Sequence, residues 1–330
     1  MPDSEKLRII AMGTGPFAVP SLEALRAAGH EIALVVTRPQ PPVKSRKGAP
    51  PSPVRQWAIE NNLPLFDPAS INDESAVERL NAVGADLLVV CDYGQILKPA
   101  ALATAPLGGI NLHGSLLPAY RGAAPVQRAL LSGDAVTGVS VIHMTPRLDG
   151  GPILATRQTP IADNETAGEL EDRLSKIGVE ATLESVKLLS QWDRSSPIGT
   201  VQDKTKVTRA ARLSKAEAEI NWNQPARMID CHVRGMQPWP IAYCFVPVAG
   251  KDEPIRIAVK QVQRLAAVPA GVSPGAVQVD DEGRFKVASQ DDWVQIVRLQ
   301  PAGKREMAAE EFLRGHQPMN LASRDENLEK

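Results

Sequence analysis

The sequence predicts an α/β fold, with an N-terminal doubly wound, mostly parallel sheet and a smaller C-terminal OB-like β-barrel. Two observations lead to this prediction. Up to Trp192, short apolar runs alternate with segments of helical periodicity, the pattern of a parallel sheet wrapped by helices. Beyond Ala242, β-rich runs follow one another between Pro, Gly and Asp turns.

The N-terminal strands are predicted at short, mainly apolar runs. These runs are 7–12, 32–37, 63–66, 86–91, 109–113, 139–144 and 153–155. Helices are predicted between them at 21–29, where Gly29 suits a helix C-cap, and at 54–62. A longer helix is predicted after Thr166, a suitable N-cap, because apolar residues then recur at helical spacing as far as Leu189.

The domain organisation follows from the change of pattern after Trp192. We expect an N-terminal domain over 1–192, a polar and turn-rich linker over 193–210, and a C-terminal domain over 211–330. The predicted C-terminal strands are 242–248, 255–262, 275–279, 284–289 and 293–299. Five strands at this spacing suit an OB-like barrel, a fold that often carries nucleic acid.

The composition is that of an ordinary globular protein. Of the 330 residues, 43% are hydrophobic and 23% are charged, which allows a sizeable buried core. With a formal net charge of −1, the chain as a whole does not attract polyanions. Any nucleic-acid site must therefore be a local cluster of basic residues. The three cysteines form no Cys/His cluster, and no signal peptide or membrane-spanning run is present. We therefore expect a cytoplasmic protein without a metal or a membrane partner. A monomer is also expected, although no feature of the sequence determines the oligomeric state.

Three polar side chains lie where predicted strands end. Asn111 and His113 are two residues apart in the run 109–113, so both point to the same face of that strand. Asp149 lies in a loop after the run 139–144, beside two glycines that allow close backbone approach. Taken alone, the first pair is equally well explained as a turn asparagine and a capping histidine. Together with Asp149, however, it forms a candidate site for acyl chemistry.

Each of these three residue types has a role in acyl transfer. His113 would act as a cation or acid, Asn111 as a neutral donor to a developing oxyanion, and Asp149 as the carboxylate that orients the imidazole. No GxSxG nucleophile elbow is present, so direct attack by a substrate nucleophile is expected rather than an acyl-enzyme. His143, inside an apolar run, is interpreted as structural.

The motif GTGPFA at 13–18 resembles part of a dinucleotide-binding fingerprint. Ala18 stands where the third glycine belongs, and Pro16 removes an amide that a pyrophosphate could use. A tight turn between strand and helix is therefore favoured over dinucleotide binding.

The segments INLHGSLLPAYRGAAPVQRAL (110–130) and LDGGPIL (148–154) resemble the signature of the folate-dependent formyltransferases. This resemblance implies that Asn111, His113 and Asp149 are catalytic. CDYGQIL (91–97) resembles a segment that borders the pterin pocket in that family. The resemblance thus implies a folate site formed by Ser115, Leu116, Leu117, Pro118, Tyr93 and Gly94.

Further segments at 38–55, 211–222, 235–243 and 299–307 resemble the members of this family that act on an aminoacylated tRNA. The implied formyl donor is 10-formyltetrahydrofolate, and the implied acceptor is the α-amino group of methionyl initiator tRNA, for translation initiation. Contacts with RNA phosphates require basic side chains. The candidates are Lys44, Arg46 and Lys47 in an insertion after the second strand, and Lys206, Arg209, Lys215 and Lys304.

Two other functions stay open on the sequence alone. A formyltransferase acting on a sugar nucleotide would share the catalytic trio without needing the basic loop. A noncatalytic folate- or RNA-binding module would keep the ligand sites without turnover. The alternative to RNA contact for the basic loop is that it is an ordinary solvated loop.

Overall fold

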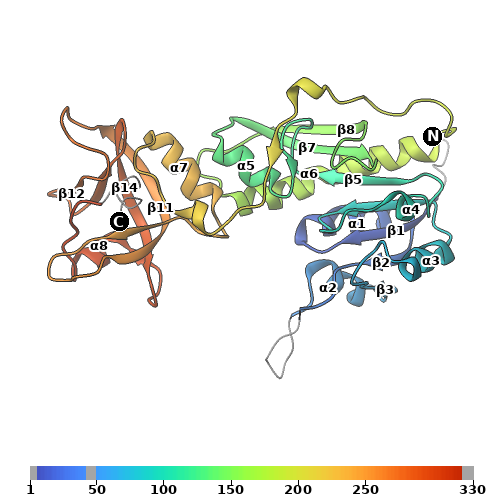
Figure 1. Cartoon of the computed structure of the whole chain (residues 1–330), viewed down its shortest axis with the longest axis horizontal. Coiled ribbons are helices and arrows are strands. Elements are labelled where there is room, and N and C mark those ends of the chain that lie inside the picture. The colour runs from blue at the N-terminus through green and yellow to red at the C-terminus, as the bar shows by residue number, and fades with distance from the viewer. Residues whose placement is uncertain (1–5, 42–49, 322–330) are drawn as a thin grey trace. The chain divides into compact units, whose positions relative to one another are not determined.

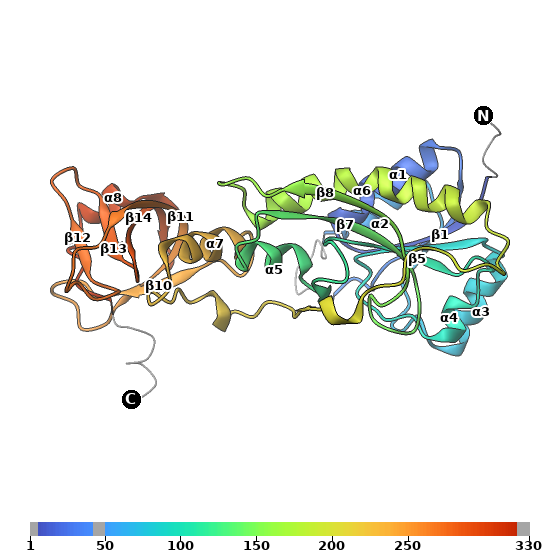
Figure 2. The same ribbon diagram turned by 90° about the horizontal axis from the view of Figure 1, so that it is seen from above.

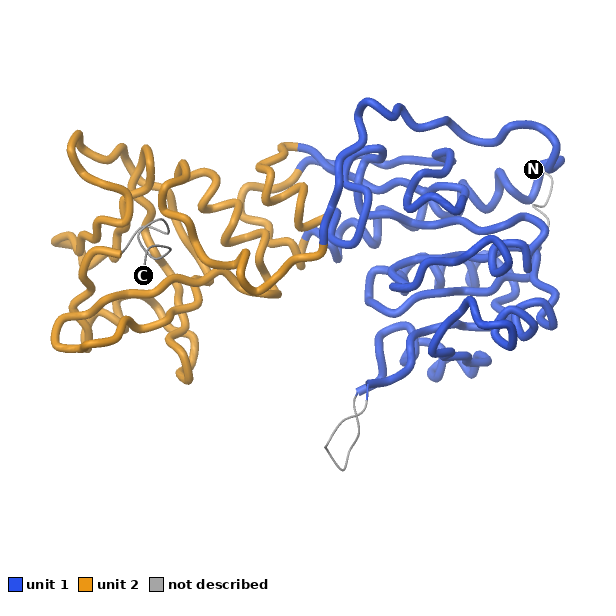
Figure 3. The backbone as a smooth tube through the Cα atoms, viewed as in Figure 1, with its two compact units in different colours: residues 1–125, 136–160, 170–211 blue, residues 126–135, 161–169, 212–330 orange. Residues whose placement is uncertain are grey.

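The computed structural model describes residues 6–41 and 50–321, which form two compact units (Figures 1 and 3). Unit 1 contains the described residues within 1–125, 136–160 and 170–211, and unit 2 contains those within 126–135, 161–169 and 212–330. The segment 193–210, expected as a linker, is thus part of unit 1. The expected boundaries of independently folding domains stay a prediction.

Unit 1 is built on a seven-stranded sheet with the order β3-β2-β1-β4-β5-β7-β8. Its strands are β1 (Arg8–Gly13), β2 (Glu31–Val36), β3 (Leu65–Phe66), β4 (Leu87–Cys91), β5 (Gly109–His113), β7 (Val136–His143) and β8 (Ile153–Pro160). The first five pair in parallel, whereas β7 runs antiparallel to both β5 and β8. The predicted doubly wound, mostly parallel sheet is confirmed.

Helices cover both faces of this sheet (Figure 2). One face carries α1 (Val19–Ala27) and α6 (Ala167–Ser190), and the other carries α3 (Glu74–Val83) and α4 (Pro99–Leu102). The remaining helices of unit 1 are α2 (Pro53–Glu60) and the 3₁₀ turns η1 (Pro16–Ala18) and η2 (Lys204–Lys206). The core on the α3 and α4 side includes Ile10, Met12, Leu88 and Val90, all nearly inaccessible to solvent.

The start of α6 has the cap that the sequence predicts. Thr166 Oγ1 accepts the main-chain N–H of Glu169 at 3.3 Å, and the Glu169 carboxylate accepts the N–H of Thr166 at 2.9 Å. This reciprocal arrangement is a capping box, which satisfies two of the free N–H groups at a helix start. At the end of α1, Gly29 has a φ of +87°, the left-handed conformation that favours glycine.

Unit 2 is dominated by a curved antiparallel sheet with the order β10-β11-β14-β13-β12, in which β15 also pairs with β14. The strands are β10 (Tyr243–Val246), β11 (Ile255–Ala267), β12 (Val277–Val279), β13 (Phe285–Ala288), β14 (Asp292–Pro301) and β15 (Met307–Ala308). The helices are α5 (Pro125–Leu131), η3 (Ala216–Ala218), α7 (Ala226–Gly235) and α8 (Ala309–Leu313). Register shifts along β11 and β14 allow this sheet to curve. The predicted small β-barrel is confirmed.

Candidate active site

Asn111 and His113 lie side by side on one face of β5. The residue between them, Leu112, packs toward α6, where a Cβ at Gly178 would come within 2.8 Å of the Leu112 side chain. Because side chains alternate along a strand, Asn111 and His113 point to the opposite face, which carries α3 and α4. His113 is only 5% exposed, whereas Asn111 is half-buried. Among the described residues, the Asn111 carboxamide makes no hydrogen bond.

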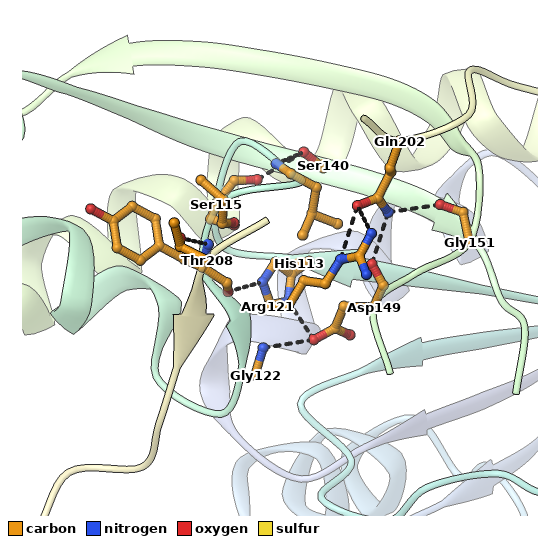
Figure 4. Close-up of polar contacts among 12 residues, drawn as sticks. His113, Ser115, Arg121, Gly122, Ser140, Asp149, Gly151, Gln202 and Thr208 are labelled. Carbon is orange, nitrogen blue, oxygen red and sulfur yellow. Dashed lines mark hydrogen bonds and ion pairs between the residues drawn. The ribbon is translucent and has the colours of Figure 1, made fainter. Parts of the chain in front are cut away.

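His113 and Asp149 face one another (Figure 4). The Nδ1 atom of His113 lies 3.8 Å from Oδ2 of Asp149, and both side chains are largely buried. The other ring nitrogen, Nε2, lies 2.8 Å from the main-chain carbonyl oxygen of Tyr120. The same Asp149 oxygen accepts the main-chain N–H of Gly122 at 2.8 Å. The two expected partners therefore meet, and the loop after β5 contacts both of them.

Asp149 reaches this position from an unexpected direction. Because β7 is antiparallel to β5, it ends with His143 opposite Ile110, near the start of β5. His113 lies three residues further along β5, about 10 Å away at the rise of an extended strand. The loop 144–152 must therefore fold back over the sheet to bring the carboxylate to the imidazole. Proximity thus does not arise, as the sequence suggested, from neighbouring strand ends.

Glycines make this fold-back possible. A Cβ at Gly151 would lie 1.8 Å from the carbonyl oxygen of His143, which no side chain can tolerate. Asp149 itself has a φ of +47°, in the left-handed region that non-glycine residues rarely adopt. Such a conformation persists only where the surroundings hold it, and it is frequent at functional sites.

The segment 200–210 forms hydrogen bonds with the loops that carry the candidate site, and no sequence pattern indicates these contacts. Thr200 pairs with Ile153 through two main-chain hydrogen bonds of 2.8 Å. The short strand β9 (Arg209–Ala210) pairs in parallel with β6 (Arg121–Gly122), and Thr208 Oγ1 accepts the N–H of Tyr120 at 2.8 Å. Between these contacts, Gln202 bonds to Arg121 and to the Asp149 loop (Figure 4). The polar composition of this segment resembled a linker.

Four of the six residues expected to border folate, those at 115–118, occupy the loop that follows β5. Ser115 is fully buried, and its hydroxyl donates to the carbonyl oxygen of Ala119 at 2.7 Å. Ser140 Oγ donates to the Ser115 carbonyl oxygen at 2.8 Å and accepts the N–H of Leu117 at 3.0 Å. Leu116 and Pro118 are half-buried. These bonds hold the loop in place, and its role in folate binding stays a prediction.

Tyr93 and Gly94 follow β4, the strand next to β5. Tyr93 packs in the core beneath α3 and α4, and its buried hydroxyl has no hydrogen-bond partner among the described residues. Burial raises the pKa of Tyr93 to about 12, so the hydroxyl keeps its proton near neutral pH and can donate. Gly94 is exposed, with a φ of +79°. Both segments leave the sheet at the same edge because β4 and β5 are parallel.

The basic residues expected to contact tRNA are distributed over both units. Lys206 and Arg209 are exposed in unit 1, and Lys215 and Lys304 are exposed in unit 2. The first of these lies 3.9 Å from Asp203, an exposed and therefore weak ion pair. The loop cations Lys44, Arg46 and Lys47 lie outside the described residues. Their proposed contacts with RNA stay predictions.

His143, in contrast, serves the packing of unit 1. Its Nε2 lies 2.9 Å from the carbonyl oxygen of Leu107, and its ring meets Trp192 edge-on.

Over residues 6–41 and 50–321, no group of three or more His, Cys, Asp or Glu side chains is placed to hold a metal ion. Within the same ranges, no helix combines the length and apolarity needed to cross a bilayer.

Comparison with known proteins places both parts of the chain. Residues 5–186 match the family described as formyl transferase, and residues 212–317 match the formyl transferase C-terminal domain. The chain belongs to the formyl transferase family.

Its relatives define the branch of that family. The chain is 58% identical over 320 residues to the methionyl-tRNA formyltransferase of Rhodopirellula baltica, covering 95% of each protein. It is 40% identical over 310 residues to that of Methylococcus capsulatus, covering 94% of this chain and 97% of the relative. Within the family, the chain therefore falls among the methionyl-tRNA formyltransferases, which are one-carbon transferases.

Solved structures agree on the fold. The N-formyltransferase from Helicobacter canadensis, in complex with folinic acid and dTDP-3-aminofucose, superposes with a TM-score of 0.64. The comparison covers 89% of this chain and 99% of that chain, at 15% sequence identity. At this identity the likeness supports the fold alone.

Proposed function

We propose that this chain transfers the formyl group of 10-formyltetrahydrofolate to the α-amino group of methionyl initiator tRNA. The observation that carries the proposal is the pairing of His113 with Asp149 across 3.8 Å, beside the half-buried carboxamide of Asn111. These are the cation, carboxylate and neutral donor that acyl transfer to an amine requires. The identities of the donor and the acceptor are inferred from the relatives of this chain, the methionyl-tRNA formyltransferases.

The reaction starts by direct attack of the amine on the formyl carbon. Esterification to tRNA removes the methionyl carboxylate, and an α-amino group with a pKa of at most about 8 is substantially unprotonated near neutral pH. The enzyme therefore needs no strong base to generate the nucleophile. Attack places a negative charge on the formyl oxygen of a tetrahedral intermediate, and the folate nitrogen leaves when that intermediate collapses.

The contacts of the three residues indicate which role each has in the remaining steps. The Asn111 carboxamide is uncommitted among the described residues, so it is the direct N–H donor to the oxyanion. His113 contacts the Tyr120 carbonyl oxygen through Nε2, so as an imidazolium it stabilises the oxyanion mainly through its charge. Asp149 pairs with that charge and assists the transfer, through water, of the proton that the attacking amine loses to the folate nitrogen that leaves.

The folate and RNA sites complete the proposal. The donor binds beside the loop 115–118 and the segment 93–94, which leave the sheet at the same edge because β4 and β5 are parallel. The tRNA backbone is held by Lys44, Arg46, Lys47, Lys206, Arg209, Lys215 and Lys304. The enzyme acts in the cytoplasm, where initiator tRNA is charged, and works as a monomer.

The test is a formylation assay with three acceptors. The protein is mixed with 10-formyltetrahydrofolate and, separately, with methionyl initiator tRNA, methionyl elongator tRNA or an amino-sugar nucleotide. Release of tetrahydrofolate with the initiator tRNA, and much less with the other two, supports the proposal. Turnover only with the sugar nucleotide would identify a different formyltransferase, and no turnover with any acceptor would indicate a binding module.

A further inference from the structure

Gln202 is a buried residue that uses its entire side-chain amide around Asp149 (Figure 4). Its Nε2 donates to the carbonyl oxygens of Asp149 and Gly151 at 2.8 and 2.7 Å. Its Oε1 accepts from Nε and Nη2 of Arg121 at 3.1 and 2.6 Å. A primary amide has two N–H donors and two acceptor positions, so all four are occupied. The orientation of this amide is therefore fully determined.

These four bonds join two loops that together arrange the reacting side chains. One is the loop 144–152, which folds back over the sheet and places Asp149 in a left-handed conformation. The other contains Tyr120, whose carbonyl oxygen contacts His113, and Gly122, whose N–H holds the Asp149 carboxylate. Gln202 contacts the first loop through its donors and the second through Arg121.

Resting on the formyl transfer proposed above, we propose that Gln202 is a positioning residue of this reaction. Its carboxamide holds the two loops at the separation at which the Asp149 carboxylate faces the His113 imidazole. The main chain of Asp149 is held by Gln202 and its side chain by Gly122, so loss of the glutamine releases one of the two supports. Misplacement of a catalytic group by about 1 Å can lower a rate by about 10²-fold.

The test starts from Gln202→Met, which keeps the length of the side chain but removes its donors and acceptors. We expect kcat to fall by about 10²-fold with little change in KM for either substrate. Gln202→Glu keeps the size of the side chain and, when ionised, an acceptor for Arg121, yet it loses both donors to the Asp149 loop. It should therefore lose kcat to a similar extent. Wild-type kcat in Gln202→Glu would overturn the proposal.

A double variant separates positioning from general stability. If Gln202 acts through Asp149, adding Gln202→Met to Asp149→Asn should lower kcat by no more than about twofold further, because the carboxylate it positions is already absent. A structural defect would instead multiply the two losses, and that outcome would also overturn the proposal. The matched control is Gln237→Met in unit 2, where Gln237 Nε2 likewise donates to two carbonyl oxygens, those of Val233 and Lys260.

The activity of the wild-type protein shows whether formyl transfer itself fails or only the positioning role of Gln202. If wild type forms no formyl-methionyl-tRNA, the proposed function fails before any variant is compared. If wild type and Gln237→Met are active while the double variant shows multiplied losses, formyl transfer stands and the positioning role of Gln202 fails.

Discussion

Replacing Asp149 by asparagine tests the charge pairing on which the proposed mechanism depends. Asparagine keeps the size of the side chain and can still accept the N–H of Gly122, so the loop is retained while the negative charge is lost. In the proposed mechanism His113 is protonated when the oxyanion forms, and two unit charges 3.8 Å apart, the distance between Nδ1 of His113 and Oδ2 of Asp149, interact by about 4 kcal/mol at an effective dielectric constant of about 20. This energy corresponds to about 10³-fold in rate.

Single-turnover formylation with excess enzyme measures this loss without interference from product release. We expect the rate of Asp149→Asn to fall by about 10³-fold, whereas the Kd for methionyl initiator tRNA, measured by titration, stays near the wild-type value. Asp281→Asn, at an exposed position of unit 2, is the matched control for loss of one surface carboxylate. Wild-type turnover in Asp149→Asn would refute the assignment of this carboxylate to the reaction.

Three further predictions follow from individual residues. Asn111→Ala should lower the single-turnover rate by about 10²- to 10³-fold in the same assay, the cost of one oxyanion donor; an unchanged rate would contradict its role. Neutralising the three cations of the loop 44–47 should weaken tRNA binding and flatten the dependence of log Kd on log salt, measured by titration; an unchanged slope would assign the loop to solvent. In unit 2, the N–H of Arg284 and the cations around it lower the pKa of Asp280 to about 2. This carboxylate therefore stabilises the fold above its unfolded pKa of 3.8, and the difference in Tm between wild type and Asp280→Asn should shrink as the pH falls toward 2.

Most of the fold could be predicted because its signals are local. Each predicted strand of unit 1 overlaps an observed strand, since buried strands appear as short, mainly apolar runs. The helix that follows Thr166 was equally accessible, because its cap and its periodicity lie in one stretch of sequence. Strand direction could not be predicted from such local signals. An apolar run gives no sign that β7 turns antiparallel.

The candidate site was only partly predictable for a related reason. The spacing of Asn111 and His113 determines that they share a face, and the glycines after Asp149 indicated a close backbone approach. Which groups would hold these side chains was hidden, because the holders are main-chain atoms of Tyr120 and Gly122. Every residue type offers the same main-chain carbonyl group, and nearly every type the same N–H, so the sequence does not indicate such partners. Gln202 was hidden too, within a segment whose polarity resembled a linker.

The direction of β7 explains why the site needs support from such a segment. A loop that follows a parallel strand would leave the sheet beside the end of β5 and could reach His113 directly. The loop 144–152 instead starts near Ile110 and folds back to His113, and only its ends, Met144 and Pro152, bond to strand main chain, at Gly109 and His143. Buried main-chain carbonyl groups need hydrogen-bond donors, and the Gln202 amide supplies them at Asp149 and Gly151. The geometry of the reacting groups is therefore inseparable from the segment 200–210, although that segment contributes none of the three groups proposed to react.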